Sequence, residues 1–414
     1  MRIFHLADLH FGKSNYGQSF IEDQKYWIDQ FMSLCDKNRP DAIVVAGDVY
    51  DSSRPTGEAS DLLSSFISGV SDRNIPLFLI AGNHDNPKML EYVSGILNKN
   101  GVYIAGRITK EIRHVTLDDP DGYGPVTFWM LPYIFPEAVA KILGKEEGIR
   151  TYEEAMRAIL AEQEIDVSGR NILLSHQNVT SNGVEVERGG SESLVGGLGG
   201  IDYSVYDDFD YVALGHIHSG YHAGRPEVRY AGTPICYHLE EAKMRERGVI
   251  EVVIGKKGEN ISTQTIPIPP LHKVRYIKKT RQEIYDLLKD DPGRNEYIGI
   301  DITDERRTPE VEAYLRGLIE SRGSVLLSIT SSKVSDTVSL ASAEAQAVKE
   351  KAIEDLFADF FTSQSGDVPP TEEEYSLMKF AAELQRNNRE NDPSDSTDVD
   401  KIIEFAKNLG GEEK

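Results

Sequence analysis

The sequence predicts an α/β protein built around a largely parallel sheet. Five short, continuously apolar runs have the composition of strands that are buried on both faces, at residues 3–7, 42–46, 77–81, 171–175 and 211–214. Two helix-like segments separate the first three of these runs, at residues 21–37 and 57–70. A strand, a helix and a strand in succession imply a right-handed crossover between parallel strands.

A smaller α+β domain is predicted after a proline-rich step at residues 266–270. Strand and helix signals alternate beyond that step, at residues 273–277, 281–288, 297–302, 309–321 and 325–329. Thr308 is a suitable N-cap for the second helix of this domain, because Pro309 then occupies the first helical position. We therefore expect three parts: a catalytic domain at 1–268, a small domain at 271–335 and a helical segment at 341–414.

The last part of the chain is predicted to be helical and interrupted by an acidic linker. Apolar residues four apart form a stripe that two neighbouring phenylalanines widen; its members are Val348, Ala352, Leu356, Phe357, Phe360 and Phe361. A second amphipathic segment follows at 372–384, then a polar, acidic stretch at 387–400 with the composition of a flexible linker, and a short helix at 399–408. Short helices are marginal alone, so the stripe must pack against the body of the chain or against a partner.

Composition limits the class of protein. At 414 residues the chain is long enough for two or three domains, and no apolar run approaches the ~20 residues that span a bilayer. The two cysteines, Cys35 and Cys236, are expected to be free thiols in a reducing compartment, so the chain is expected in the cytoplasm. The net charge of −23 disfavours unaided binding of a polyanion, so nucleic-acid binding would require metals, a local basic patch or a partner.

Residue types that bind metals follow the predicted strands. They are Asp8, His10, Asp48, Asn83, His84, His176, His216 and His218. Because ligands of open α/β sheets bind beyond the carboxyl ends of the strands, these residues are expected to converge. A lone histidine in a strand is usually a core residue, and one Gly-Asp or His-x-His is weak evidence, but five such fragments in order predict a pair of divalent cations. Two cations suit attack on a phosphate ester.

Roles within this set can be predicted from its chemistry. Asp48 is the expected bridge between the two metals. Asp8, His10 and His218 are expected to complete one site, and Asn83, His176 and His216 the other. Carboxylates and imidazoles without thiolates suit manganese, iron or zinc, of which manganese is the expected ion. His84 is expected to donate a proton or stabilise charge, with Asp85 orienting its ring.

A glycine-rich stretch at 189–200 lacks the Gly-Lys-Ser/Thr of a P-loop, so it is not read as a phosphate-binding P-loop. It is expected to be a mobile loop near the site.

The fragments resemble the calcineurin-like metallophosphoesterase superfamily, whose pattern is Asp-x-His, Gly-Asp, Gly-Asn-His-Asp/Glu, His and Gly-His-x-His. That resemblance implies two packed mixed sheets flanked by helices. A closer similarity is to the SbcD family of bacterial nuclease subunits. The stretches that carry it are HLADLHFGK, FDYVALGHIH, YAGTPICYHLEEA and AIEDLFADFF, the last followed by TEEE.

One departure from that family is Asp51, where archaeal and eukaryotic relatives carry a histidine. It is expected either to steer a neighbour or to cap a turn.

The SbcD resemblance implies a manganese-dependent DNA nuclease of repair, replication and recombination. Such enzymes degrade duplex ends as exonucleases and cut single strands or hairpins as endonucleases. It also implies an SbcC-type ATPase partner in a heterotetramer of two nuclease and two ATPase subunits, and it leaves homodimerisation open. The anchors for that partner would be Leu356, Phe357, Phe360 and Phe361. The alternatives are a small-molecule or cyclic-nucleotide phosphodiesterase of the same superfamily and a non-catalytic scaffold on that fold.

A basic cluster in the small domain is a candidate DNA contact. Its members lie on or just after one predicted strand and are Lys273, Arg275, Lys278 and Lys279. The alternative is a solvated edge strand, and the sequence favours neither reading. In the functional reading this cluster lies over the DNA backbone, where contacts position the nucleic acid without reading its sequence.

Overall fold

The computed structural model describes residues 1–145, 148–181, 200–243, 247–290, 294–332, 370–371 and 375–380. The chain divides into two units, Met1–Ser331 and Ser332–Lys414. The first unit contains two predicted domains, and the division near residue 270 stays a prediction.

Two mixed sheets form the centre of the first unit. The first has the order β15(Ser262–Ile266), β14(Val249–Val253), β1(Arg2–Leu6), β4(Ala42–Ala46), β5(Leu77–Ile80), β6(Val102–Ala105). The second has the order β13(Val228–Tyr230), β12(Tyr211–Gly215), β9(Arg170–His176), β8(Pro125–Leu131), β7(Arg113–Asp118). Within the sheets β1, β4, β5 and β6 pair in parallel, as do β8, β9, β12 and β13, so all five predicted strands lie in parallel segments.

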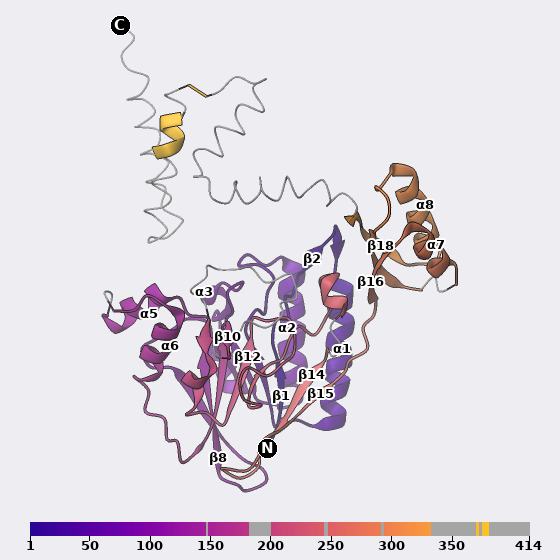
Figure 1. Cartoon of the computed structure of the whole chain (residues 1–414). Coiled ribbons are helices and arrows are strands. Elements are labelled where there is room, and N and C mark those ends of the chain that lie inside the picture. Colours follow the sequence, from indigo (N-terminus) through magenta and orange to yellow (C-terminus); the bar gives the residue numbers. More distant parts are fainter. Residues whose placement is uncertain are drawn as a thin grey trace. The chain divides into compact units, whose positions relative to one another are not determined.

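The sheets pack face to face, and helices cover their outer faces. Phe78 of β5 stacks on Phe128 of β8 with ring centroids 4.3 Å apart, inside an apolar core between the sheets. Helices α1(Ile21–Asn38) and α2(Gly57–Ser71) pack on the first sheet, where Trp27 and Phe31 are buried. Helices α5(Pro136–Leu143) and α6(Tyr152–Leu160) pack on the second (Figure 1). The predicted fold of two packed mixed sheets flanked by helices is confirmed.

Short elements complete this part of the chain. They are β2(Ser14–Asn15), β3(Gln18–Ser19), α3(Pro87–Leu90), α4(Ser94–Leu97), β10(Val179–Thr180) and β11(Ile201–Asp202), with 3-10 turns at Asn98–Asn100, Tyr203–Tyr206 and Glu240–Lys243. Both cysteines are free thiols. Among the helices of the described ranges, none is both long and apolar enough to cross a bilayer.

The small domain contains all five predicted elements in the predicted order. They are β16(Lys273–Lys279), α7(Arg281–Asp290), β17(Glu296–Ile302), α8(Pro309–Glu320) and β18(Val325–Ser331), and the three strands pair in parallel with β17 at the centre. Thr308 caps α8 through its side chain, which accepts from the Val311 amide. On the other face of the sheet, Tyr297 packs against Phe20 and Tyr237, which belong to the larger part of the unit.

Little of the second unit is described. Residues 375–380 are helical and fall inside the predicted segment 372–384. The partner anchors Leu356, Phe357, Phe360 and Phe361 lie outside the described residues, as does nearly all of the predicted loop at 189–200.

Candidate metal centre

The predicted ligands gather where strands of both sheets end. Asp8 follows β1, Asp48 follows β4 and Asn83 follows β5, while His176 ends β9 and His216 follows β12. Strand β4 of the first sheet contacts β9 and β12 of the second, which brings these strand ends together.

Several of these residues have a left-handed backbone conformation, which residues other than glycine rarely adopt. The φ angle is 52° at Asp8, 44° at His10, 48° at Asp48 and 98° at His216. Left-handed backbone at non-glycine residues costs free energy and is concentrated at functional sites, where surrounding contacts enforce it. Four such residues in one cluster therefore indicate a site whose geometry has been favoured over local stability.

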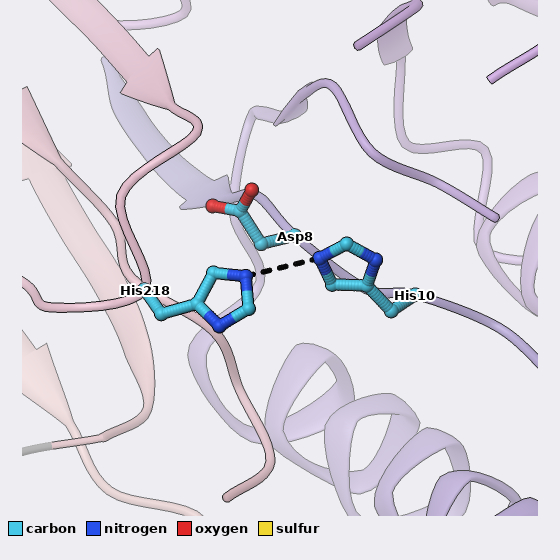
Figure 2. Close-up of side chains that lie close together, drawn as sticks. All are labelled: Asp8, His10 and His218. Atoms are coloured by element: carbon cyan, nitrogen blue, oxygen red, sulfur yellow. Dashed lines mark hydrogen bonds between the residues drawn. The ribbon is translucent and has the colours of Figure 1, made fainter. Parts of the chain in front are cut away.

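One group of ligand-type atoms comprises Asp8, His10 and His218 (Figure 2). The Nε2 atoms of His10 and His218 lie 3.1 Å apart, and all three side chains are buried. The Nδ1 atom of His218 donates to Glu241 Oε1 at 2.8 Å, which leaves the His218 Nε2 lone pair directed at His10. Burial lowers the pKa of His10 well below its usual range, so this imidazole is neutral, as a metal ligand must be.

The other predicted ligands are Asp48, Asn83, His176 and His216. Asp48 also belongs to two further groups of ligand-type atoms, one with Asp8 and His176 and one with His10 and His84. Asn83 Oδ1 lies 3.1 Å from His176 Nε2 and 3.0 Å from His216 Nδ1. Asp48 Oδ2 lies 3.4 Å from His176 Nε2 and 3.8 Å from His10 Nε2, so this carboxylate is within reach of both predicted sets. The structure thus brings together all seven residues predicted as ligands, with Asp48 between the two sets.

Two glycines make room for this arrangement. A Cβ atom at Gly82 would lie 2.1 Å from Asp48 Oδ1, and one at Gly215 would lie 2.7 Å from His176 Nδ1 and 2.0 Å from the Ala46 carbonyl oxygen. Such distances are far below van der Waals contact. Any larger residue at either position would displace a ligand-type side chain.

The donor chemistry of the cluster fits divalent cations. The Ala46 carbonyl can only accept, so His176 Nδ1 carries the proton of their 2.7 Å hydrogen bond. In the neutral ring, Nε2 then directs a lone pair at two oxygens, Asn83 Oδ1 and Asp48 Oδ2, and only a proton or a cation can satisfy such an arrangement. Burial opposes a charge on His176, yet the Asp48 carboxylate raises its pKa to about 9. Burial also raises the pKa of Asp8, to about 7.

The types of donor atom in the cluster support the same conclusion. Nitrogen and oxygen donors without thiolates match the preferences of manganese, iron and zinc. The residues present therefore fit the two-metal site that the sequence predicts.

His84 lies at the edge of the cluster, and its ring orientation differs from the prediction in one respect. Its Nδ1 donates to the Asp51 carbonyl oxygen at 2.9 Å, and its Nε2 lies 3.9 Å from Asp48 Oδ2. The prediction that Asp85 orients the ring is wrong. Three backbone amides, those of Val49, Tyr50 and Gly82, donate to the Asp85 carboxylate and hold it away from His84.

Comparisons with known proteins agree with this geometry. Residues 1–220, more than half of the chain, match the family model described as calcineurin-like phosphoesterase. The chain belongs to the calcineurin-like phosphoesterase family. Residues 270–365 of this phosphoesterase match a second model, described as type 5 capsule protein repressor C-terminal domain.

Two relatives narrow the family further. The phosphoesterase is 30% identical over 306 residues to the SbcD subunit of nuclease SbcCD from Staphylococcus epidermidis, and the match covers 73% of this chain and 79% of the relative. It is 31% identical over 284 residues to the SbcD subunit of nuclease SbcCD from Staphylococcus saprophyticus, and that match covers 67% of this chain and 72% of the relative. It is therefore a member of the SbcD family, and the predicted resemblance is confirmed.

Asp51, the predicted departure from the family pattern, contacts neighbours on both sides. Its carboxylate pairs with Lys13 Nζ at 2.7 Å, while its carbonyl holds His84. Of the two predicted roles, the structure favours steering a neighbour over capping a turn.

The basic cluster of the phosphoesterase is largely neutralised by acids. Arg275 pairs with Glu296 at 3.1 Å, Lys278 with Asp301 at 3.1 Å, and Lys279 lies 3.9 Å from Glu283. Strand β16 is an edge strand, on which Lys273 is exposed. These pairs weaken the local field, and DNA contact by the cluster stays a prediction.

Sequence reasoning missed the residues that hold the candidate ligands in position. Glu241 holds His218, and Tyr237 and Gln24 hold the backbone around His10. The only signal for Glu241 is its place in the stretch YHLEEA, which carries the family resemblance but no chemical pattern of its own.

Proposed function

We propose that this phosphoesterase is a metal-dependent DNA nuclease that works in the cytoplasm with an SbcC-type ATPase in DNA repair, replication and recombination. The observation that carries the proposal is the convergence of seven side chains of metal-binding types, with Asp48 within reach of both predicted sets. The family membership supports it, since the two relatives carry the name of a nuclease subunit. Cleavage of duplex ends and of single strands or hairpins are the two activities proposed.

In this proposal each set of residues holds one divalent ion, preferably manganese. Asp8, His10 and His218 form one set, Asn83, His176 and His216 the other, and Asp48 belongs to both. Two such ions, when bound, activate a water and neutralise the attacking and leaving oxygens of a phosphate ester. Mixed carboxylate, amide and imidazole ligands support this assignment.

The proposed role of His84 is to donate a proton to, or stabilise charge on, the phosphate or leaving oxygen. Its ring is 37% exposed, so substrate can reach it, whereas five of the predicted ligands are buried: Asp8, His10, Asp48, His176 and His218. Because Nδ1 already donates to the Asp51 carbonyl, Nε2 is the atom that faces the centre. The hydrogen bond fixes the ring, and the Lys13–Asp51 pair steadies the loop that supplies it.

The net charge of −23 is compatible with this function if the partner supplies most of the DNA-binding surface. We propose that residues 1–268 cut, that residues 271–335 contact the DNA backbone through Lys273 and its basic neighbours, and that residues 341–414 dock on the ATPase. Two nuclease and two ATPase subunits would then form a symmetric assembly.

The two alternatives explain less of the molecule. A small-molecule or cyclic-nucleotide phosphodiesterase would share the metal centre but gives no reason for roughly 145 further residues beyond the catalytic domain. A non-catalytic scaffold predicts that ligands have been lost, whereas every predicted ligand is present.

The test is hydrolysis by the purified chain with manganese. Hairpin DNA, blunt duplex DNA and cyclic nucleotides are each incubated with the chain, with and without the ATPase and ATP. We expect cleavage of DNA that ATP stimulates in the presence of the ATPase. Hydrolysis of cyclic nucleotides without any cleavage of DNA would contradict the proposed function and favour the first alternative.

A further inference from the structure

We infer that Glu241 is a positioning residue that builds one of the two metal sites, the one formed by Asp8, His10 and His218. The inference rests on the proposed function, because it names a support for the same centre. Glu241 belongs to none of the groups of ligand-type atoms found among the described residues. It acts through the His218 imidazole.

The Glu241 carboxylate is completely buried and held on several sides. Its Oε1 accepts from His218 Nδ1 at 2.8 Å, and its Oε2 accepts from the Tyr237 amide at 3.0 Å and pairs with Arg247 at 3.3 Å. The Arg247 guanidinium donates in turn to the Glu241 carbonyl oxygen at 2.9 Å and to that of Thr233 at 3.3 Å. A buried charge with this many partners is fixed in position.

This contact decides which nitrogen of His218 faces the metal site. A carboxylate oxygen only accepts, so Nδ1 carries the proton and Nε2 keeps its lone pair. That Nε2 lies 3.1 Å from His10 Nε2, where the two rings converge (Figure 2). A carboxylate behind a ligating histidine also raises the basicity of the ring and typically accounts for about 10- to 100-fold in metal affinity.

The same short segment braces the other ligand loop of this site. The Tyr237 hydroxyl donates to the Leu9 carbonyl at 2.6 Å, between the ligands Asp8 and His10. Gln24 Nε2 donates to the His10 carbonyl at 2.7 Å and to the Tyr237 hydroxyl at 2.9 Å. Residues 237–241 therefore support the Asp8–His10 loop and His218 at once.

The second metal site does not depend on Glu241. There the corresponding support of His176 is a backbone carbonyl, that of Ala46, which accepts from Nδ1 at 2.7 Å. This asymmetry separates a positioning role from a general structural one. Loss of the Glu241 carboxylate should weaken one metal site and spare the other, whereas general loosening would weaken both.

The test is manganese binding by Glu241→Gln, measured by calorimetric titration and by electron paramagnetic resonance without any activity assay. A glutamine at this position can accept a hydrogen bond from His218 only if its NH2 group faces the Tyr237 amide and Arg247, which are themselves donors. The variant therefore cannot satisfy both sides as the carboxylate does. We expect one site to keep its affinity and the other to weaken about 10- to 100-fold. The spectrum should change from that of a coupled manganese pair to that of an isolated ion at concentrations that fill both sites of the unmodified chain.

Asp119→Asn is the matched control. Asp119 is a buried carboxylate that pairs with Arg170 at 2.6 Å and with the terminal amine of Met1 at 3.3 Å, at the opposite ends of the strands from the metal centre. This variant should lose thermal stability but bind two manganese ions normally. Normal binding of both ions by Glu241→Gln would overturn the inference, as would equal loss of both ions or the same loss in Asp119→Asn.

Failure of the proposed function would look different. If the unmodified chain binds two manganese ions but cuts no DNA, the proposed function fails while the inference about Glu241 can still be tested. If the unmodified chain binds no manganese, the metal assignment itself fails before any variant is made.

Discussion

Replacing Gly82 with alanine should damage the metal centre through a single added methyl group. The new Cβ atom would lie 2.1 Å from Asp48 Oδ1, 2.4 Å from the Asp48 amide nitrogen and 2.8 Å from Asp48 Cγ. Normal contact between such atoms is about 3.5 Å, so the Asp48 side chain or the ends of β4 and β5 must move by about 1 Å. The φ angle of Gly82 is not in the left-handed region, so the clash alone causes the effect.

The expected loss follows from that displacement. Overpacking of a buried site costs about 1–3 kcal/mol of folding free energy. A reacting group misplaced by about 1 Å costs on the order of 10²-fold in rate. The shift would also break the 2.9 Å hydrogen bond from the His84 amide to Asp48 Oδ1, which aligns the partly buried histidine with the centre.

The assay is kcat/KM on a chromogenic phosphodiester with manganese, alongside urea unfolding of the metal-free chain. We expect a rate about 10²-fold below that of the unmodified chain and a lower unfolding midpoint. Gly317→Ala is the control. Gly317 lies inside α8, and a Cβ atom added there would meet nothing within 4 Å. That variant should be up to about 1 kcal/mol more stable with unchanged activity. A Gly82→Ala chain with normal rate and metal content would refute the reasoning.

Three further predictions concern separate parts of the molecule. His84→Ala should keep its metals by elemental analysis while turnover falls about 10²–10⁴-fold, and loss of metal would instead make His84 a ligand. Lys273→Glu should weaken cleavage of DNA but spare cleavage of a small phosphodiester. Because phosphate contacts release counterions, the difference from the unmodified chain should shrink as the salt concentration rises. Equal loss on both substrates would contradict DNA contact. Deletion of everything after Ser339 should leave a folded, manganese-binding phosphodiesterase that no longer co-purifies with the ATPase, and normal complex formation would exclude the tail as the docking element.

The convergence of the candidate ligands was predictable because its signal is local. Each ligand follows a short apolar strand, and parallel strands of one sheet place such residues at the same edge. The same holds for α8, since the Thr308 cap and Pro309 fix its start within one turn. These features depend on neighbours in the sequence, and the sequence contains them in full.

The supports of the ligands could not be predicted, because they depend on contacts made across the fold. Glu240 and Glu241 are adjacent and chemically identical, yet Glu240 is exposed and Glu241 is completely buried against His218. Asp85 follows His84 directly, but backbone amides from a distant loop capture its carboxylate. No spacing or composition rule identifies which carboxylate of a chain will be captured in this way.

The central claim is that Asp48 is shared by two metal ions, and the stoichiometry of Asp48→Ala tests it most directly. Manganese bound per chain is measured by elemental analysis after equilibrium dialysis, with the unmodified chain in parallel. Because Asp48 Oδ2 lies 3.4 Å from His176 Nε2 and 3.8 Å from His10 Nε2, its removal should weaken both sites together. We predict two ions in the unmodified chain, neither in the variant, and no hydrolysis by the variant. A variant that still holds two ions would contradict the shared role of Asp48.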